Sequence, residues 1–108
     1  MAVSVYVEKV GNEPESYLVA FDSEVRSLWT PVINRRELHH LGYIVSACDW
    51  IDENNYEDIK AEVGVMLQEL YARCEYEEDE RNPVFRCKRL LDIIGRFNND
   101  ASLHISIG

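Results

Sequence analysis

The sequence predicts a single α+β domain in which a small antiparallel sheet, formed by an N-terminal hairpin and a C-terminal strand, is covered by about three helices. Apolar and polar residues alternate near both ends of the chain, as they do in strands that bury one face. Between these ends, residues 56–74 and 84–97 carry apolar side chains at the i, i+3, i+4 spacing of amphipathic helices. A chain of 108 residues, of which 46% are hydrophobic, fits one domain (1–108) that buries a core without metal or disulfide support.

The N-terminal hairpin is predicted from two apolar stretches on either side of a turn. Val3, Val5 and Val7 alternate with residues of the opposite face, and residues 11–14 (Gly-Asn-Glu-Pro) form a turn cluster. Tyr17–Phe21 then returns as the second strand. Because a two-stranded hairpin alone is marginal in water, we expect the C-terminal strand to complete the sheet.

Residues 22–31 give a mixed pattern. Asp22, Ser23 and Glu24 favour the start of a short helical turn. Thr30-Pro31 is expected to stop any continuation, because the residue before a proline is driven away from helical dihedral angles.

The next segment favours a helix, with a strand as the competing interpretation. Asn34 and Glu37 have the spacing of a capping box. An apolar face at helical spacing then extends as far as Cys48 or Ile51, and its members are Leu38, Leu41, Ile44, Val45 and Cys48. Residues 43–45 taken alone fit a buried strand that begins after Gly42. We favour the helix because the apolar face is longer than a short strand.

The clearest helix is predicted over Tyr56–Cys74. Asn55, at the end of a polar connector over residues 49–55, is expected to cap its first turn, where Glu57 and Asp58 favour the helix dipole. Its apolar face is formed by Tyr56, Ile59, Val63, Met66, Leu67, Leu70, Tyr71 and Cys74.

A second long helix and a final strand are predicted after it. Asn82-Pro83 starts the helix, since proline suits the first helical position, and the apolar face runs from Val84 to Phe97. Asn98-Asn99-Asp100 is expected to end it. In the final strand, Ser102, His104 and Ser106 should point outward, and the side chains that should point inward are Leu103, Ile105 and Ile107.

The net charge of −9 is unevenly distributed along the chain. Residues 1–44 hold six acidic and four basic side chains (−2), residues 45–80 hold twelve and two (−10), and residues 81–108 hold two and five (+3). Such a field repels nucleic acid and attracts basic surfaces. We therefore expect a basic protein partner and no direct binding of nucleic acid.

The cysteines and the absence of apolar runs indicate a reducing, aqueous compartment. Cys48, Cys74 and Cys87 are expected to be free, buried thiols, because an odd number without a Cys-x-x-Cys spacing fits neither a disulfide framework nor a zinc site. No apolar run approaches the roughly 20 residues that span a bilayer. Residues 1–6 lack the basic start of a signal peptide, so we expect a cytoplasmic protein without membrane contact.

No motif for catalysis, cofactor binding or metal binding stands out in the sequence. Glu37 and His40 would share a helical face but lack an evident third ligand, and His39 would point elsewhere, so these histidines are interpreted as surface residues. The five glycines form no Gly-x-Gly phosphate loop, and there is no Gly-x-Ser-x-Gly nucleophile elbow. We therefore predict that the chain is not an enzyme and uses no cofactor.

Two acidic segments that contain aromatic residues flank the central helix. Tyr and Trp are favoured anchors in protein interfaces, and the charge around them can steer a basic partner. The alternative is a solvated surface that only keeps the protein soluble. The predicted partner-binding residues are Asp49, Trp50, Asp52, Glu53, Tyr76, Glu77, Glu78, Asp79 and Glu80.

In its size, acidity, α+β layout and lack of catalytic motifs, the chain resembles bacterial immunity proteins, in particular the cognate inhibitors of contact-dependent or polymorphic toxins. The resemblance implies an inhibitor that docks an acidic and aromatic surface on a basic toxin, often a nuclease, and excludes its substrate. Two other interpretations stay open. One is a phage-encoded nucleic-acid mimic such as an anti-CRISPR protein, and the other is a structural or oligomeric module that pairs through its edge strands. We expect a monomer or a weak homodimer.

Overall fold

The computed structural model describes residues 2–100 and 102–108 and confirms the α+β class. Four strands form one antiparallel sheet in the order β2-β1-β4-β3. Their bounds are Val3–Glu8 (β1), Glu15–Ala20 (β2), Asp49–Trp50 (β3) and His104–Ile107 (β4). The helical segments are Asp22–Glu24 (α1), the π-helix Val25–Trp29 (η1), Thr30–Arg36 (α2), His39–Ile44 (α3), Tyr56–Arg73 (α4) and Pro83–Asn99 (α5).

The sheet buries one face and leaves the other open. Val3, Val5 and Val7 are buried, and Ile107 and Ile105 of β4 lie opposite Val5 and Val7 on the same face. The two central strands therefore present one apolar layer to the core, as their alternating sequences predict. The hairpin and the C-terminal strand are confirmed as parts of one sheet.

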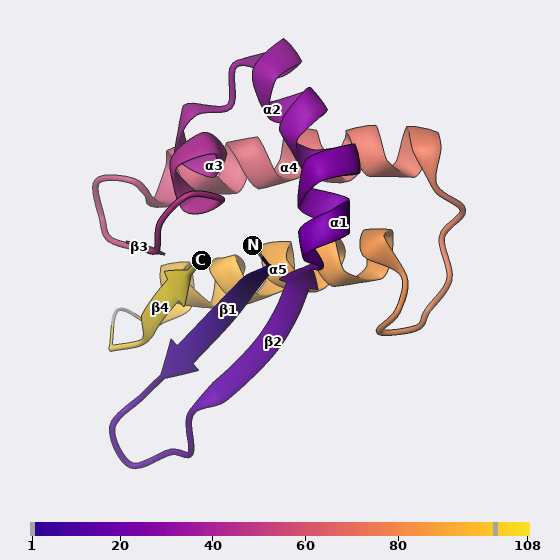
Figure 1. Cartoon of the computed structure of the whole chain (residues 1–108). Coiled ribbons are helices and arrows are strands. Elements are labelled where there is room, and N and C mark those ends of the chain that lie inside the picture. Colours follow the sequence, from indigo (N-terminus) through magenta and orange to yellow (C-terminus); the bar gives the residue numbers. More distant parts are fainter. Residues whose placement is uncertain (1, 101) are drawn as a thin grey trace.

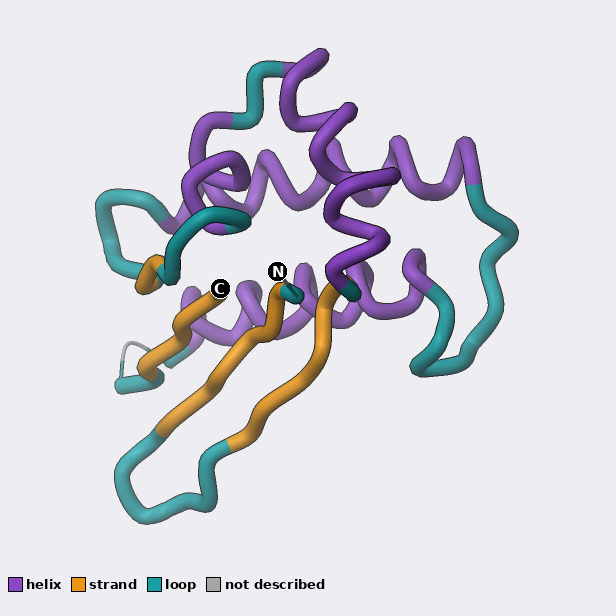
Figure 2. The backbone as a smooth tube through the Cα atoms, viewed as in Figure 1, coloured by secondary structure: helices purple, strands orange, loops and turns teal. Residues whose placement is uncertain are grey.

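The helices lie on the buried face of the sheet and around it. Figure 1 shows α5 running behind the sheet, α4 alongside α5, and the α1–α3 segment crossing in front of α4. The tube in Figure 2 shows the same arrangement, in which no helix covers the front of β1 and β2. Ile59, Val63 and Leu70 of α4 are fully buried against this core. The sheet thus has one face covered by helices and one face that no helix covers.

The expected stop at Thr30-Pro31 is wrong, because helical structure continues from Asp22 to Arg36. A π-helix over Val25–Trp29 precedes the proline, and its wider turn is closed by the Thr30 amide, which donates to the carbonyl of Val25. A proline inside an α-helix lacks a donor and clashes with the preceding turn. The π-turn absorbs both effects, so the helix passes Pro31 without ending.

The helix expected over residues 41–48 is shorter than predicted, and the competing strand at 43–45 is absent. Glu37 adopts a left-handed conformation (φ 54°) that ends α2, so it forms no capping box with Asn34. The α3 helix then stops at Ile44. Its N-terminus is capped from another helix instead, because the Glu62 carboxylate of α4 accepts hydrogen bonds from the backbone N–H of His40 and Leu41.

The connector expected over residues 49–55 contains the fourth strand. Asp49 and Trp50 pair with Ile107 and Ser106 of β4, and the amide of Ile51 extends the pairing by donating to the carbonyl of Ile105. Two residues are too few to show a strand period, so the sequence carries no signal for β3. The expected cap by Asn55 is also wrong. Its side chain is hydrogen-bonded to Trp50 and Asp52 in this segment and makes no capping hydrogen bond to α4.

The two long helices are confirmed with nearly the predicted bounds. α4 begins at Tyr56 and ends at Arg73. α5 begins at Pro83, and the Asn82 side chain caps it by accepting hydrogen bonds from the amides of Val84 and Phe85. None of the helices in the described part of the chain is long and apolar enough to cross a membrane.

The three cysteines are free, but they are not all buried. Cys87 is fully enclosed, and burial raises the pKa of its thiol to about 12. Cys74 is half-buried just after α4, and Cys48 is exposed, which corrects the prediction for that residue. The physical reason is that α3 ends before Cys48, so this side chain does not lie on a buried helical face.

Candidate partner-binding surface

The predicted partner-binding residues lie in two groups at opposite ends of α4. Residues 49–53 precede the helix beside β3, and residues 76–80 follow it in the loop to α5 (Figure 1). An α-helix of 18 residues is about 27 Å long. The structure therefore does not bring the two groups together, and each has to be considered as a separate surface.

In the group 76–80, part of the negative charge is neutralised by the chain itself. The Asp79 carboxylate accepts hydrogen bonds from the backbone and the guanidinium of Arg81, which hold the pKa of Asp79 at about 2. The Glu80 carboxylate pairs with Arg89 of α5 at 3.2 Å. Glu77 and Glu78 remain exposed. The negative charge that this loop presents to solvent is therefore smaller than its number of acidic residues suggests.

Tyr76 is also engaged within the protein. Its ring lies 5.9 Å from that of Tyr71 of α4, and the ammonium of Lys88 lies 5.5 Å from its ring centroid. These contacts fix the loop onto α4 and α5. The group 76–80 is therefore in part a structural connection between two helices.

The group 49–53 is held rigidly by hydrogen bonds of its own backbone and side chains. The Asp52 carboxylate accepts from the amides of Asn54 and Asn55, and the Asn55 side chain donates to the carbonyl of Trp50 at 2.7 Å. Ile51, between the two acidic positions, is buried in the core. The indole of Trp50 is thus presented from an ordered segment, with 53% of the residue exposed.

Trp50 belongs to a row of side chains across the open face of the sheet. Ser106 of β4 is paired on one side with Trp50 and on the other with Tyr6 of β1, so all three side chains point to the same face. Tyr6 is 43% exposed and Trp50 is 53% exposed, whereas Ser106 between them is only 5% exposed. Ser106 was predicted to point outward into solvent, and the two flanking aromatic residues explain why it is buried.

The charge around this row is strongly negative. Residues 49–58 contain five acidic side chains, at positions 49, 52, 53, 57 and 58, and no Lys or Arg. Asp58 lies 3.6 Å from the imidazole of His40, and Lys60 places its ammonium 5.6 Å from the ring centroid of Tyr56. We call Tyr6, Trp50 and Ser106, with the adjoining acidic residues Asp52 and Glu53, the Trp50 face. Asp49 pairs with Ile107 and so lies on the opposite face of the sheet.

Tyr6 and Ser106 belong to this face but not to the predicted partner-binding residues. The sequence does carry a signal for Tyr6, because Val5 and Val7 are inward positions of β1 and an aromatic residue between them must point outward. The sequence does not show that β4 lies between β1 and β3. This strand order places Tyr6 and Trp50 on either side of Ser106.

The described residues contain no group of three or more His, Cys, Asp or Glu side chains placed to hold a metal ion. His39 is exposed, and His40 lies beside Asp58. An open groove of about 540 Å³ lies between α2 and α4. No protein-family model, no curated protein and no solved structure matches this chain.

Proposed function

We propose that this protein is a binding protein that neutralises a basic partner protein, in the manner of the bacterial immunity proteins, with the Trp50 face as its docking surface. One observation carries the proposal: Trp50 is half exposed, rigidly held, and set in a segment with five acidic and no Lys or Arg side chains. Aromatic anchors surrounded by charge are typical of protein interfaces.

In the proposed interface, the Trp50 indole and the acidic side chains have different roles. Burying the exposed half of an indole contributes about 2–3 kcal/mol of binding free energy. The hydrogen bonds of Asp52 and Asn55 order the segment before binding, so little conformational entropy is lost when a partner docks. The acidic side chains accelerate the encounter with a positively charged surface. Such a surface occurs at the active site of a nuclease, where docking would exclude the nucleic acid.

The experiment that tests this proposal measures binding and protection together. The partner to test is any basic, toxin-like protein whose gene adjoins the gene for this chain. Its affinity for the chain is measured by isothermal titration calorimetry, and its toxicity is measured in cells that express the chain. We expect tight binding and full protection by the wild-type chain, and loss of both in Trp50→Ala.

Tyr43→Ala is the matched control. Tyr43 of α3 is 57% exposed, slightly more than Trp50, but lies outside the Trp50 face. We expect this variant to bind and protect like the wild-type chain. Equal binding and protection by Trp50→Ala and Tyr43→Ala would contradict the proposed surface, and absence of binding by the wild-type chain would contradict the proposed function.

A further inference from the structure

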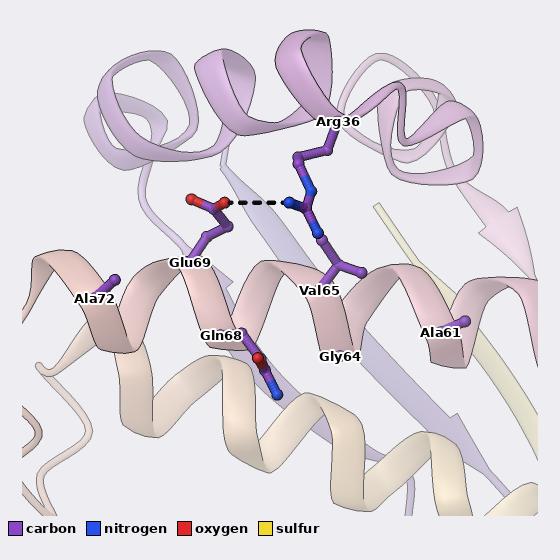
Figure 3. Close-up of a pocket in the computed structure, with 7 residues that line it drawn as sticks. All are labelled: Arg36, Ala61, Gly64, Val65, Gln68, Glu69 and Ala72. Atoms are coloured by element: carbon purple, nitrogen blue, oxygen red, sulfur yellow. Dashed lines mark ion pairs between the residues drawn. The ribbon is translucent and has the colours of Figure 1, made fainter.

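A second surface with a different character lies along α4, on the side of the helix away from the core. Its buried face is formed by residues at positions 56, 59, 63, 66 and 70. The opposite side of the helix carries mostly small side chains between two grooves, as Figure 3 shows for one of them. We call this the α4 ridge, and its residues are Ala61, Gly64, Val65, Gln68 and Ala72.

Gly64 has no role in the packing of the monomer. It stands in the middle of an 18-residue helix, where glycine costs about 0.5–1 kcal/mol relative to alanine. A Cβ atom built on Gly64 would meet nothing within 4 Å, so no neighbouring atom requires its absence. The position leaves the backbone of α4 open to close approach from outside the molecule.

The two sides of the ridge differ in chemistry. On the α2 side, three guanidinium groups converge on one carboxylate, because Arg35, Arg36 and Arg73 all pair with Glu69. This cluster keeps an excess of two positive charges in a chain whose net charge is −9. On the α5 side, the groove is lined by Leu67, Tyr71 and Leu91 and is mainly apolar.

The charged groups beside α4 are acidic at its first turn and basic at its last two turns, and the exposed acids Glu75, Glu77 and Glu78 follow beyond Arg73. Glu57 and Asp58 occupy its first turn, and the Asp58 side chain is 70% exposed. The arginine cluster lies beside its last two turns. In an antiparallel pair of α4 helices related by a two-fold axis, the acidic first turn of one copy lies beside the arginine cluster of the other. The apolar grooves of the two copies then lie on the same side of the pair.

From this complementarity we propose that the chain forms a homodimer through the α4 ridge, with the two α4 helices antiparallel and Gly64 near the crossing point. A helix about 27 Å long and its flanks bury several hundred Å² per copy, which is at the lower end of specific interfaces. The dimer is therefore weak and depends on protein concentration. This surface does not include Trp50, although the acidic first turn of α4 contributes charge to both surfaces. Gly64→Leu leaves those acids in place, so it tests the dimer separately from the proposed function.

Sedimentation equilibrium of the full chain from micromolar to millimolar concentration tests the dimer. The apparent mass should rise with concentration from 12.6 kDa toward twice that value. Gly64→Leu should weaken dimerisation by at least about tenfold, since a branched side chain on the ridge keeps the two helices apart. Gly95→Leu is the matched control, because Gly95 is also a helical glycine with open space around it but lines neither groove.

A charge exchange tests the antiparallel geometry. Asp58→Lys and Arg73→Glu should each weaken dimerisation by about tenfold, because each sets like charges against each other, and the double variant should restore most of the affinity. Circular dichroism checks that every variant is folded. A wild-type chain that stays monomeric at millimolar concentration would overturn the dimer and leave the groove to a helix of another protein. A dimer unaffected by Gly64→Leu, or a double variant weaker than both single variants, would overturn the α4 interface.

Discussion

Arg86 and Glu24 form a bidentate ion pair that joins the last helix to the first helical turn. Nη1 of Arg86 lies 2.6 Å from Oε1 of Glu24, and Nη2 lies 2.8 Å from Oε2. The guanidinium is 1% exposed and also donates to the backbone carbonyls of Val19, Glu80 and Arg81. One buried cation therefore connects β2, α1, the acidic loop and α5.

The first prediction concerns the loss of one partner from this pair. Glu24→Gln should lower the free energy of unfolding by about 3–5 kcal/mol, because it leaves a buried guanidinium without its counter-charge. Urea denaturation followed by circular dichroism measures the effect. The control is Arg26→Gln, which removes an exposed pair with Asp22 and should change the free energy of unfolding by less than about 1 kcal/mol. A similarly small loss in Glu24→Gln would show that Arg86 does not depend on Glu24.

The second prediction concerns stability in acid. Burial raises the pKa of Glu24, but the hydrogen bonds from Arg86 and from the Phe21 amide outweigh it and lower the pKa below 4.5. The pKa of Asp79 is likewise lowered, from 3.8 to about 2, by Arg81. A carboxyl group whose pKa is lower in the folded than in the unfolded state stabilises the fold at pH values above its unfolded-state pKa. This stabilisation is lost as the pH falls through the folded-state pKa. The urea midpoint should therefore be steady near neutral pH and fall from about pH 4.5 toward pH 2.

Glu24→Gln is also the control for this pH dependence. Because the variant has no carboxylate to protonate at position 24, its urea midpoint should start lower and fall less steeply in acid than that of the wild-type chain. Parallel curves for the two proteins would assign the acid sensitivity to other carboxylates.

The third prediction separates two leucines of α4 that the sequence pattern treats alike. Leu70 is fully buried, whereas Leu67 is half-buried beside the groove to α5. Leu70→Ala should lower the free energy of unfolding by about 2–5 kcal/mol, because it leaves a cavity in the core. Leu67→Ala should cost about 1 kcal/mol or less, since solvent can reach the vacated space. Equal losses of unfolding free energy for the two variants in urea denaturation would show that Leu67 and Leu70 are buried to the same extent.

The fourth prediction concerns the three thiols. Cys48 is exposed and should react rapidly with Ellman's reagent in the native protein, whereas Cys87 should react only after denaturation because its thiol is buried and has a pKa of about 12. The half-buried Cys74 should react at an intermediate rate. Cys48→Ser should remove the fast phase alone. A fast phase that persists in Cys48→Ser would show that Cys74 or Cys87 is open to solvent.

The parts of the fold that the sequence predicted are those in which periodicity is repeated over many residues. β1, α4 and α5 each alternate between buried and exposed positions in register with their geometry, and β4 departs from this only at Ser106, which is buried. The errors occur where a distant residue decides the local structure. The cap of α3 comes from Glu62, eighteen residues after the end of that helix, so no local pattern could reveal it.

In the candidate site, too, some features can be predicted from the local sequence and others depend on contacts between distant residues. The prediction of Trp50, Asp52 and Glu53 as partner-binding residues rests on their chemistry alone, because an aromatic residue among acids stands out in any sequence. The neutralisation of Asp79 and Glu80 by arginines and the position of Tyr6 beside Ser106 depend on how the chain folds back on itself. For this reason the docking surface that we propose is the Trp50 face and not the acidic loop, although the loop contains the denser run of acids.

The fifth prediction separates the roles of charge and of the indole in binding a basic partner. Glu53→Lys with Glu57→Lys should slow association by about tenfold or more, because both side chains are exposed in the acidic segment 49–58 that contains Trp50 and steer the encounter. Glu77→Lys with Glu78→Lys makes the same change in net charge at the other end of α4 and should slow association less. Trp50→Ala should mainly speed dissociation, as expected when a packed anchor is removed.

Stopped-flow or surface-plasmon measurements at several salt concentrations distinguish these effects. Exposed charges are screened over about 8 Å at physiological ionic strength, so added salt should lower the wild-type association rate more than it raises the dissociation rate. The Glu53 and Glu57 double variant should show a shallower salt dependence than the Glu77 and Glu78 double variant, because the charges nearest the interface contribute most to steering. If the two double variants associate equally fast and Trp50→Ala dissociates like the wild-type chain, the partner docks elsewhere, and the acidic end of α4 serves only to keep the protein in solution.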